Sequence, residues 1–256
     1  MIWATLMTVV SAIGYVATAL VVRRRGVFRQ WSMFWARSIM FGTGIRLECR
    51  RAQKLDCGAS YVFAANHQIM LDIPLSALAV DCPFGFVAKG ELARVPFLGW
   101  AIKASPSVLV DRSNPRSTYE SMKQAGENIR AGTSVIIFPE GARSYSREIA
   151  PFQKGAFLLA LEAGVPIVPV TIVDAYEVLD EKRRVARPGV VRIEVGRPIP
   201  LKGMTRKDLP ALMQTVREAI EAPFAGSSDA RRASGIFPPG HHVTERTLKD
   251  DGYPTR

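Results

Sequence analysis

Tyr61-Val62-Phe63-Ala64-Ala65-Asn66-His67-Gln68-Ile69-Met70-Leu71-Asp72 is an apolar run that leads directly into a polar turn. The apolar run over 61–65 predicts a buried strand. Pro74 suits the first turn of a helix over 74–80. A strand, a short turn and a helix in succession are the building unit of an α/β fold, and here they place a histidine and an aspartate in the turn.

His67 and Asp72 cannot share one helix face, because positions five residues apart diverge by roughly 140° on a helix. They meet only if His67 lies in the turn and Asp72 opens the helix. The other two histidines, His241 and His242, lie in a polar C-terminal tail, so His67 is the candidate general base. Taken alone, Asp72 also fits a helix cap and His67 a structural histidine. Their occurrence together at a strand-to-helix turn favours a dyad.

The same alternation continues over residues 46–223, which we expect to form one domain. It predicts an α/β fold with a mixed, largely buried β-sheet flanked by helices. We expect strands over 46–49, 61–65, 85–88, 107–110, 135–138, 167–172 and 190–195, and helices over 74–80, 116–131, 154–163 and 206–222. Residues 224–256 are rich in Gly, Ser, Pro and charge, and we expect a flexible polar tail there.

The N-terminus predicts membrane attachment. Residues 2–22 carry no charge and would form a helix of roughly 31 Å, close to the hydrocarbon thickness of a bilayer. Arg23, Arg24 and Arg25 follow, which places the rest of the chain in the cytoplasm, by expectation at a bacterial inner membrane. We therefore expect a transmembrane or membrane-anchoring helix over 1–26. Interspersed Thr, Ser and Gly leave a re-entrant or interfacial helix as an alternative.

Residues 27–45 combine an aromatic face with arginines and predict an amphipathic helix at the membrane interface. The alternative is that this helix packs on the domain that follows. The net charge of +11 implies anionic partners, such as nucleic acid, a phospholipid surface or a CoA-like substrate. The three cysteines form no CxxC pair, and their odd number argues against a disulfide framework and a zinc site and suits a reducing cytoplasm.

Charged residues follow other predicted strands at the edge where ligands bind in α/β folds. Glu140, Gly141 and Arg143 come after the strand over 135–138, and Arg143 offers a bidentate fork for phosphate. Lys89 and Arg112 close the strands over 85–88 and 107–110. Each of these groups alone also fits an ordinary turn or solvated surface charge.

Nucleophile, phosphate-loop and dinucleotide fingerprints are absent from the sequence. With a histidine, an aspartate and no protein nucleophile, the simplest mechanism is direct transfer. His67 would deprotonate a bound hydroxyl, which attacks an activated carbonyl, while Asp72 fixes the imidazole tautomer.

Four ordered blocks resemble those of the glycerolipid acyltransferases that act on 1-acylglycerol 3-phosphate. The blocks NHxxxxD, a strand ending in arginine, FPEGTRS and VPIxPV correspond here to residues 66–72, 107–112, 138–144 and 165–170. The resemblance covers about residues 45–200. Two departures stand out, since Ala142 replaces a threonine and Ile69 replaces a serine, and both leave the acceptor less defined.

The resemblance implies that residues 46–223 are an acyltransferase catalytic domain in which His67 is the base and Asp72 its partner. Arg112 and Arg143 would hold the acceptor's phosphate, Glu140 and Gly141 would shape its glycerol site, and Lys89 would contribute from its strand end. The implied reaction moves a fatty acyl group from acyl-CoA or acyl carrier protein to the sn-2 hydroxyl of 1-acyl-sn-glycerol 3-phosphate, giving phosphatidate.

The expected partners are the lysophospholipid acceptor, the acyl donor and anionic membrane lipid, with no nucleic acid, no metal and no cofactor. Three alternatives to this reaction stay open: acylation of another lysolipid such as lyso-ornithine lipid, hydrolysis of acyl-CoA by a thioesterase, and binding of membrane surfaces without catalysis.

Overall fold

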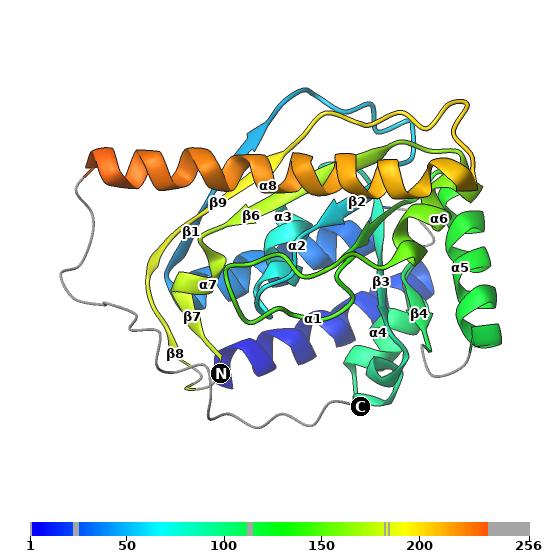
Figure 1. Cartoon of the computed structure of the whole chain (residues 1–256). Helices are drawn as coiled ribbons and strands as arrows, with labels where there is room; N and C mark the ends of the chain where they lie inside the picture. The colour runs from blue at the N-terminus through cyan, green and yellow to red at the C-terminus, as the bar shows by residue number, and fades with distance from the viewer. Residues whose placement is uncertain (1, 23–25, 112–114, 182, 184, 235–256) are drawn as a thin grey trace, which may run out of the picture.

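The computed structural model describes residues 2–22, 26–111, 115–181, 183 and 185–234 (Figure 1). Arg23–Arg25, Arg112 and the tail beyond residue 234, with His241 and His242, lie outside the described residues. In chain order the elements are α1 (Ile2–Val21), α2 (Val27–Thr43), β1 (Ile45–Arg51), β2 (Val62–Ala65), α3 (Asp72–Ala79), β3 (Phe84–Lys89), η1 (Gly90–Arg94), α4 (Leu98–Ala104), β4 (Val108–Val110), α5 (Pro115–Arg130), β5 (Ser134–Ile137), α6 (Lys154–Ala163), β6 (Ile167–Val173), α7 (Ala175–Val178), β7 (Leu179–Asp180), β8 (Val185–Ala186), β9 (Gly189–Val195), η2 (Arg206–Asp208) and α8 (Leu209–Ser234).

A seven-stranded sheet in the order β1-β9-β6-β2-β5-β3-β4 forms the centre. Its neighbouring strands are parallel except for β6 and β9, which pair antiparallel. All seven strands that the sequence predicts are present, and the mixed α/β fold is confirmed.

Helices cover both faces of the sheet (Figure 1). Phe63 and Ala65 of β2 pack in the core cluster that includes residues of α2 and α3. Val62 and Ala64 point to the other face, into the cluster that includes residues of α5, α6 and α8. The period-two alternation of one short strand therefore joins two hydrophobic cores. The carboxyl end of β2 lies between those of its parallel neighbours β5 and β6, where loops converge on the turn after β2.

The N-terminal helices form an antiparallel hairpin. The indole N–H groups of Trp3, Trp31 and Trp35 donate across it to Ser38 O, Thr18 Oγ1 and Thr8 Oγ1 at 2.8, 3.2 and 3.0 Å. A Cβ built at Gly14 would meet the Trp31 ring, and one at Gly42 the Trp3 ring, so these glycines allow the close approach.

Both helices also pack on the rest of the protein. The Tyr15 hydroxyl donates to Ala104 O at 2.8 Å, which attaches α1 to α4. Ala36, Ile39 and Met40 of α2 are part of the core beneath the sheet. The alternative that α2 packs on the following domain is thus confirmed, while its contact with a membrane stays a prediction.

This hairpin exposes many apolar side chains. The exposed hydrophobic side chains of the two helices are Ile2, Trp3, Leu6, Val10, Ile13, Leu20, Val21, Phe34 and Phe41. Within the described residues, α1 is the one helix long and apolar enough to cross a membrane. The length and composition of α1 would allow it to cross a membrane. Its packing on α2 and α4 equally suits a helix that lies at the membrane surface.

Two parts of the fold differ from the expectation. Helix α8 continues past Ala222 to Ser234, through Pro223, because a proline removes only one helical hydrogen bond and good helix formers such as Ala225 follow it. The short helix α4 and the β7–β8 hairpin were not predicted, since both are too short to show periodicity.

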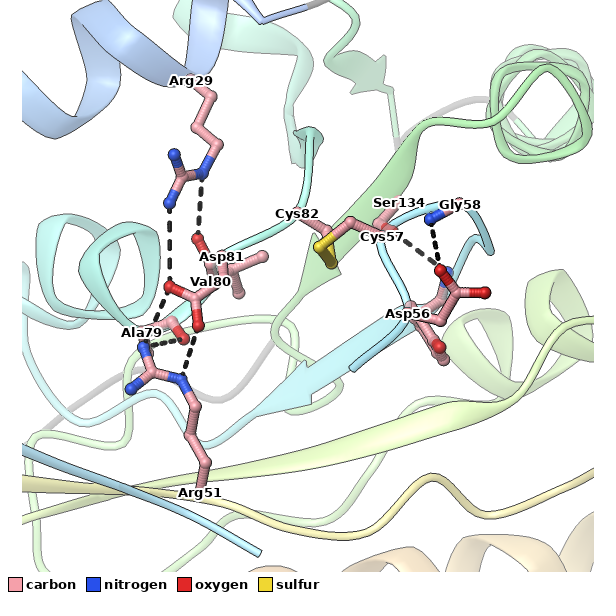
Figure 2. Close-up of a disulfide and its surroundings, with 11 residues drawn as sticks. Arg29, Arg51, Asp56, Cys57, Gly58, Ala79, Val80, Asp81, Cys82 and Ser134 are labelled. Carbon is pink, nitrogen blue, oxygen red and sulfur yellow. Dashed lines mark hydrogen bonds and ion pairs between the residues drawn. A yellow bond between two sulfur atoms is a disulfide. The ribbon is translucent and has the colours of Figure 1, made fainter. Parts of the chain in front are cut away.

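Cys57 and Cys82 form a disulfide, so the odd cysteine count was a wrong argument against disulfide bonding in this chain (Figure 2). Cys57 precedes β2 and Cys82 precedes β3, and the amino ends of parallel strands meet at one edge of the sheet. An odd cysteine count does not reveal that meeting, and Cys49 is the free thiol. Because disulfides are rare in reducing compartments, the bond also counts against the reducing surroundings that the cysteine count favoured.

Two arginines hold the segment that precedes Cys82, residues 79–81, by an ion pair and hydrogen bonds. Arg51 of β1 contacts Asp81 at 2.8 Å and donates to Ala79 O, and Arg29 of α2 donates to Val80 O (Figure 2). The end of α3 is therefore tied to β1, to α2 and, through the disulfide, to the loop before β2.

We expect reduction of this disulfide to lower the free energy of unfolding by about 3 kcal/mol, because the bond closes a 25-residue loop around the His67–Asp72 turn. The melting temperature should fall by roughly 6–12 °C when dithiothreitol is added. The check is thermal unfolding followed by circular dichroism. A Cys49→Ala variant serves as control and should show the same difference in melting temperature with and without dithiothreitol. Equal melting temperatures of the wild type with and without reductant would contradict the prediction.

Candidate active site

His67 and Asp72 form a hydrogen-bonded pair in the turn between β2 and α3. The Nδ1 atom of His67 lies 3.0 Å from Oδ2 of Asp72. The same oxygen accepts the backbone N–H groups of Gln68 and Ile69 at 2.5 and 2.8 Å. Asp72 is the first residue of α3, yet it caps the preceding turn in place of the helix, because these donors precede it in the chain. One carboxylate therefore fixes both the shape of the turn and the orientation of the imidazole.

The environment of this pair suits a general base. Asp72 is fully buried, and burial raises the pKa of its carboxyl, while hydrogen bonds from His67, Ile69 and Gln68 oppose that rise and favour the ionised form. An ionised Asp72 requires the proton of neutral His67 on Nδ1, which leaves Nε2 as an acceptor. Among the described residues, no side chain or backbone group hydrogen-bonds Nε2. The His67 side chain is 12% exposed, so the imidazole is largely shielded from solvent but not fully buried.

Phe138 supports the imidazole from the end of β5. Its ring stacks on the His67 ring with centroids 4.1 Å apart and an interplanar angle of 23°. The sequence showed Phe138 only as the first letter of a motif block, and its contact with His67 depends on the parallel pairing of β2 with β5.

Glu140 is buried and holds backbone groups. Its two carboxylate oxygens accept the N–H groups of His67 at 2.5 Å and Ala150 at 2.8 Å. Burial raises the pKa of Glu140, and these two hydrogen bonds oppose the rise. The two oxygens thus join the turn that carries His67 to the segment at Ala150, and the role of Glu140 in shaping a glycerol site stays a prediction.

Two further contacts hold the turn in place. The N–H groups of Ser144 and Tyr145 donate to the carbonyls of His67 and Gln68 at 2.9 and 3.2 Å, which joins the loop after β5 to the turn after β2. Asn66 is buried and bonds both the N–H and the carbonyl of Ile172 in β6. The turn is thus supported from both strands next to β2.

Arg143 lies in the same loop, next to the turn. The loop begins with a tight turn in which Gly141 has a φ of 82° and donates to Phe138 O, a conformation that favours glycine. The guanidinium of Arg143 lies over the Tyr145 ring, 5.0 Å from its centroid, and its Nη1 lies 2.6 Å from Glu181. Glu181, on the β7–β8 hairpin, was not among the predicted site residues.

The other predicted cations are less closely placed. Lys89 ends β3 and pairs with Glu91 at 2.9 Å, with most of its side chain in solvent. Its neighbour in the sheet is Val110 at the end of β4, two residues before Arg112, which lies outside the described residues. Lys89 thus shares the sheet edge with His67, and no described contact joins the two.

The site can remove a proton from a hydroxyl near Nε2 and place an anionic group near Arg143. Groups of three or more His, Cys, Asp or Glu side chains that could hold a metal ion were not found among the residues that the structure describes. The chemistry that the described side chains offer is general-base activation of an alcohol close to an anion site.

Comparisons with known proteins bear on the family of the chain. Residues 46–173 match the family model described as Acyltransferase. The chain is 31% identical over 205 residues to the human 1-acyl-sn-glycerol-3-phosphate acyltransferase beta, covering 79% of this chain and 73% of that protein. It is 33% identical over 168 residues to a 1-acyl-sn-glycerol-3-phosphate acyltransferase of Chlamydomonas reinhardtii, covering 65% of this chain and 50% of the algal protein.

A solved structure has the same fold. The crystal structure of the 1-acyl-sn-glycerophosphate (LPA) acyltransferase PlsC from Thermotoga maritima matches with a TM-score of 0.67 and 22% identity, covering 85% of this chain and 93% of that one. The chain spans about half the length of the algal relative and nearly three quarters of the human one. The family model covers the turn with His67 and Asp72 and the loop with Arg143, and on these matches the chain belongs to the acyltransferase family.

Proposed function

We propose that the protein transfers a fatty acyl group from acyl-CoA or acyl carrier protein to the sn-2 hydroxyl of 1-acyl-sn-glycerol 3-phosphate, giving phosphatidate. The observation that carries the proposal is the His67–Asp72 pair, in which Nδ1 bonds the buried carboxylate and Nε2 has no hydrogen-bond partner among the described residues. The names of the relatives support the choice of acceptor, and Arg143 supplies a cation for its phosphate.

The reaction follows from this geometry. Nε2 of His67 takes the proton of the acceptor hydroxyl as its oxygen attacks the thioester carbonyl. Asp72 stabilises the imidazolium that forms. The carbon–sulfur bond then breaks, and the leaving thiolate takes the proton back from His67, so that the base is regenerated and no acyl-enzyme is needed.

We also propose that the protein works at a membrane surface. The exposed apolar side chains of α1 and α2 support this, because a soluble surface rarely carries so many together. The net charge of +11 would draw the protein to anionic lipid. The cytoplasmic face and the bacterial inner membrane remain predictions that rest on Arg23–Arg25.

The test uses purified full-length protein with acyl-CoA and three acceptors in parallel: lysophosphatidate, lyso-ornithine lipid and water alone. We expect phosphatidate to form with the highest kcat/KM for lysophosphatidate. Faster acylation of lyso-ornithine lipid would assign the other acceptor. Release of free fatty acid regardless of acceptor would indicate a thioesterase, and a lack of any turnover would indicate a binding protein.

Replacing Arg143 by alanine should raise the KM for lysophosphatidate about tenfold or more, because a charge-assisted hydrogen bond to phosphate is lost. The KM for acyl-CoA should change by less than about twofold, and steady-state kinetics with each substrate varied in turn measures both. Arg147→Ala is the matched control, since Arg147 lies in the same loop but is largely exposed and paired with Glu177. Equal increases in both KM values would count against an acceptor-phosphate role.

A further inference from the structure

The anion site beside His67 is occupied by a carboxylate of the chain itself. Glu181 accepts a hydrogen bond from the backbone N–H of Met70, in the turn between His67 and Asp72. It also contacts Nη1 of Arg143 at 2.6 Å. The Glu181 side chain is 14% exposed, so this contact is largely shielded from water. A backbone N–H and a guanidinium that converge on one carboxylate form the kind of cradle that also binds a phosphate oxygen.

We infer that Glu181 occupies the position of the acceptor's phosphate in the free protein and that the phosphate must displace it to reach Arg143. The inference rests on the proposed function for the identity of the anion. It makes Glu181 a residue that sets the affinity for the acceptor, with no part in the proton transfer by His67.

The structure provides for such a displacement. Glu181 follows β7, which pairs only with β8 in a separate two-stranded hairpin outside the central sheet (Figure 1). Glu181 therefore lies outside the hydrogen-bonded ladder of the central sheet, and a shift of its side chain breaks no strand pairing there. The ladder between β7 and β8, Leu179↔Ala186 and Asp180↔Val185, does not involve Glu181.

Arg143 has a second contact besides Glu181. Its guanidinium lies over the Tyr145 ring, and the N–H of Tyr145 donates to Gln68 O in the catalytic turn. When Glu181 leaves, this stacking contact keeps the guanidinium at the site. Loss of the Glu181 charge should therefore free Arg143 for a ligand. If Glu181 served only to orient Arg143, its loss would instead leave Arg143 misplaced and weaken binding.

The test is the affinity of the full-length protein for a short-chain, water-soluble lysophosphatidate, measured by titration calorimetry without acyl donor. We expect Glu181→Gln to lower the Kd about three- to tenfold, because the neutral amide competes less well for Arg143. Glu177→Gln is the matched control. It removes a carboxylate that pairs with Arg147, and it should leave the Kd unchanged.

A double-mutant cycle decides whether the effect passes through Arg143. In an Arg143→Ala background, Glu181→Gln should change the Kd by a smaller factor, because only the Met70 N–H of the cradle is left for Glu181 to block. An unchanged or higher Kd for Glu181→Gln alone, an equal gain in both backgrounds, or no binding by either wild type or Glu181→Gln would overturn the inference. Turnover is measured separately: binding that follows the expected pattern without phosphatidate formation would refute the proposed function and leave the inference standing.

Discussion

Replacing His67 by alanine should lower kcat for phosphatidate formation by about 10²-fold or more, because the proposed mechanism assigns removal of the hydroxyl proton to this side chain. The KM for acyl-CoA should change little, since the proposed role of His67 concerns the acceptor hydroxyl and not the CoA moiety. Single-turnover assays with labelled acyl-CoA measure the chemical step directly. Turnover like that of the wild type would refute the general-base mechanism.

The control for this variant addresses packing. His67 stacks on Phe138, and its removal leaves a gap beside that ring. Phe138→Leu removes the stacking contact and keeps the imidazole, and we expect a much smaller loss of kcat in that variant. Similar melting temperatures for both variants and the wild type would show that the larger loss in His67→Ala is chemical and not structural.

The turn that carries His67 and Asp72 could be predicted from the sequence, because the residues that determine its shape are close together in the chain. An apolar run, a proline two residues after an aspartate and a five-residue spacing suffice to place His67 in a turn and Asp72 at a helix start. The central strands were predictable for a similar reason, since their alternating side chains face two cores.

The contacts that support the turn depend on strand order and register, which a single sequence does not reveal. Asn66 bonds Ile172 in β6, 106 residues away, and Glu140 accepts the N–H of His67 from the loop after the neighbouring strand β5. The disulfide between Cys57 and Cys82 and the approach of Glu181 to Arg143 are of the same kind. Each needs two segments whose meeting is fixed by the whole sheet.

Replacing Asp72 by asparagine should lower kcat about 10²-fold or more while preserving the turn. Oδ2 of Asp72 holds His67, Gln68 and Ile69, whereas Oδ1 has no hydrogen-bond partner among the described residues. An asparagine can therefore place its oxygen on the three donors and its amide nitrogen in the position of Oδ1. What is lost is the negative charge that stabilises the imidazolium.

Asp72→Ala is the companion variant, because it removes the acceptor as well as the charge. It leaves the buried N–H groups of Gln68 and Ile69 unpaired, at a cost of about 1–3 kcal/mol each, so it should melt well below Asp72→Asn. If the two variants lost the same activity and the same stability, the carboxylate would act only as a structural acceptor.

The pH dependence of stability gives an independent check on the charge. Burial raises the pKa of Asp72 in the folded protein, so its contribution to stability is full when the carboxyl is protonated and is lost as the pH rises through the folded pKa. Asparagine does not titrate. In thermal unfolding, the stability of the wild type relative to Asp72→Asn should therefore decrease as the pH rises from about 4, the ordinary pKa of an aspartate, through the raised pKa of Asp72. If the stability of the wild type relative to Asp72→Asn instead increased with pH, the three N–H donors would outweigh burial and lower the pKa of Asp72. The ionised carboxylate would then stabilise the free protein.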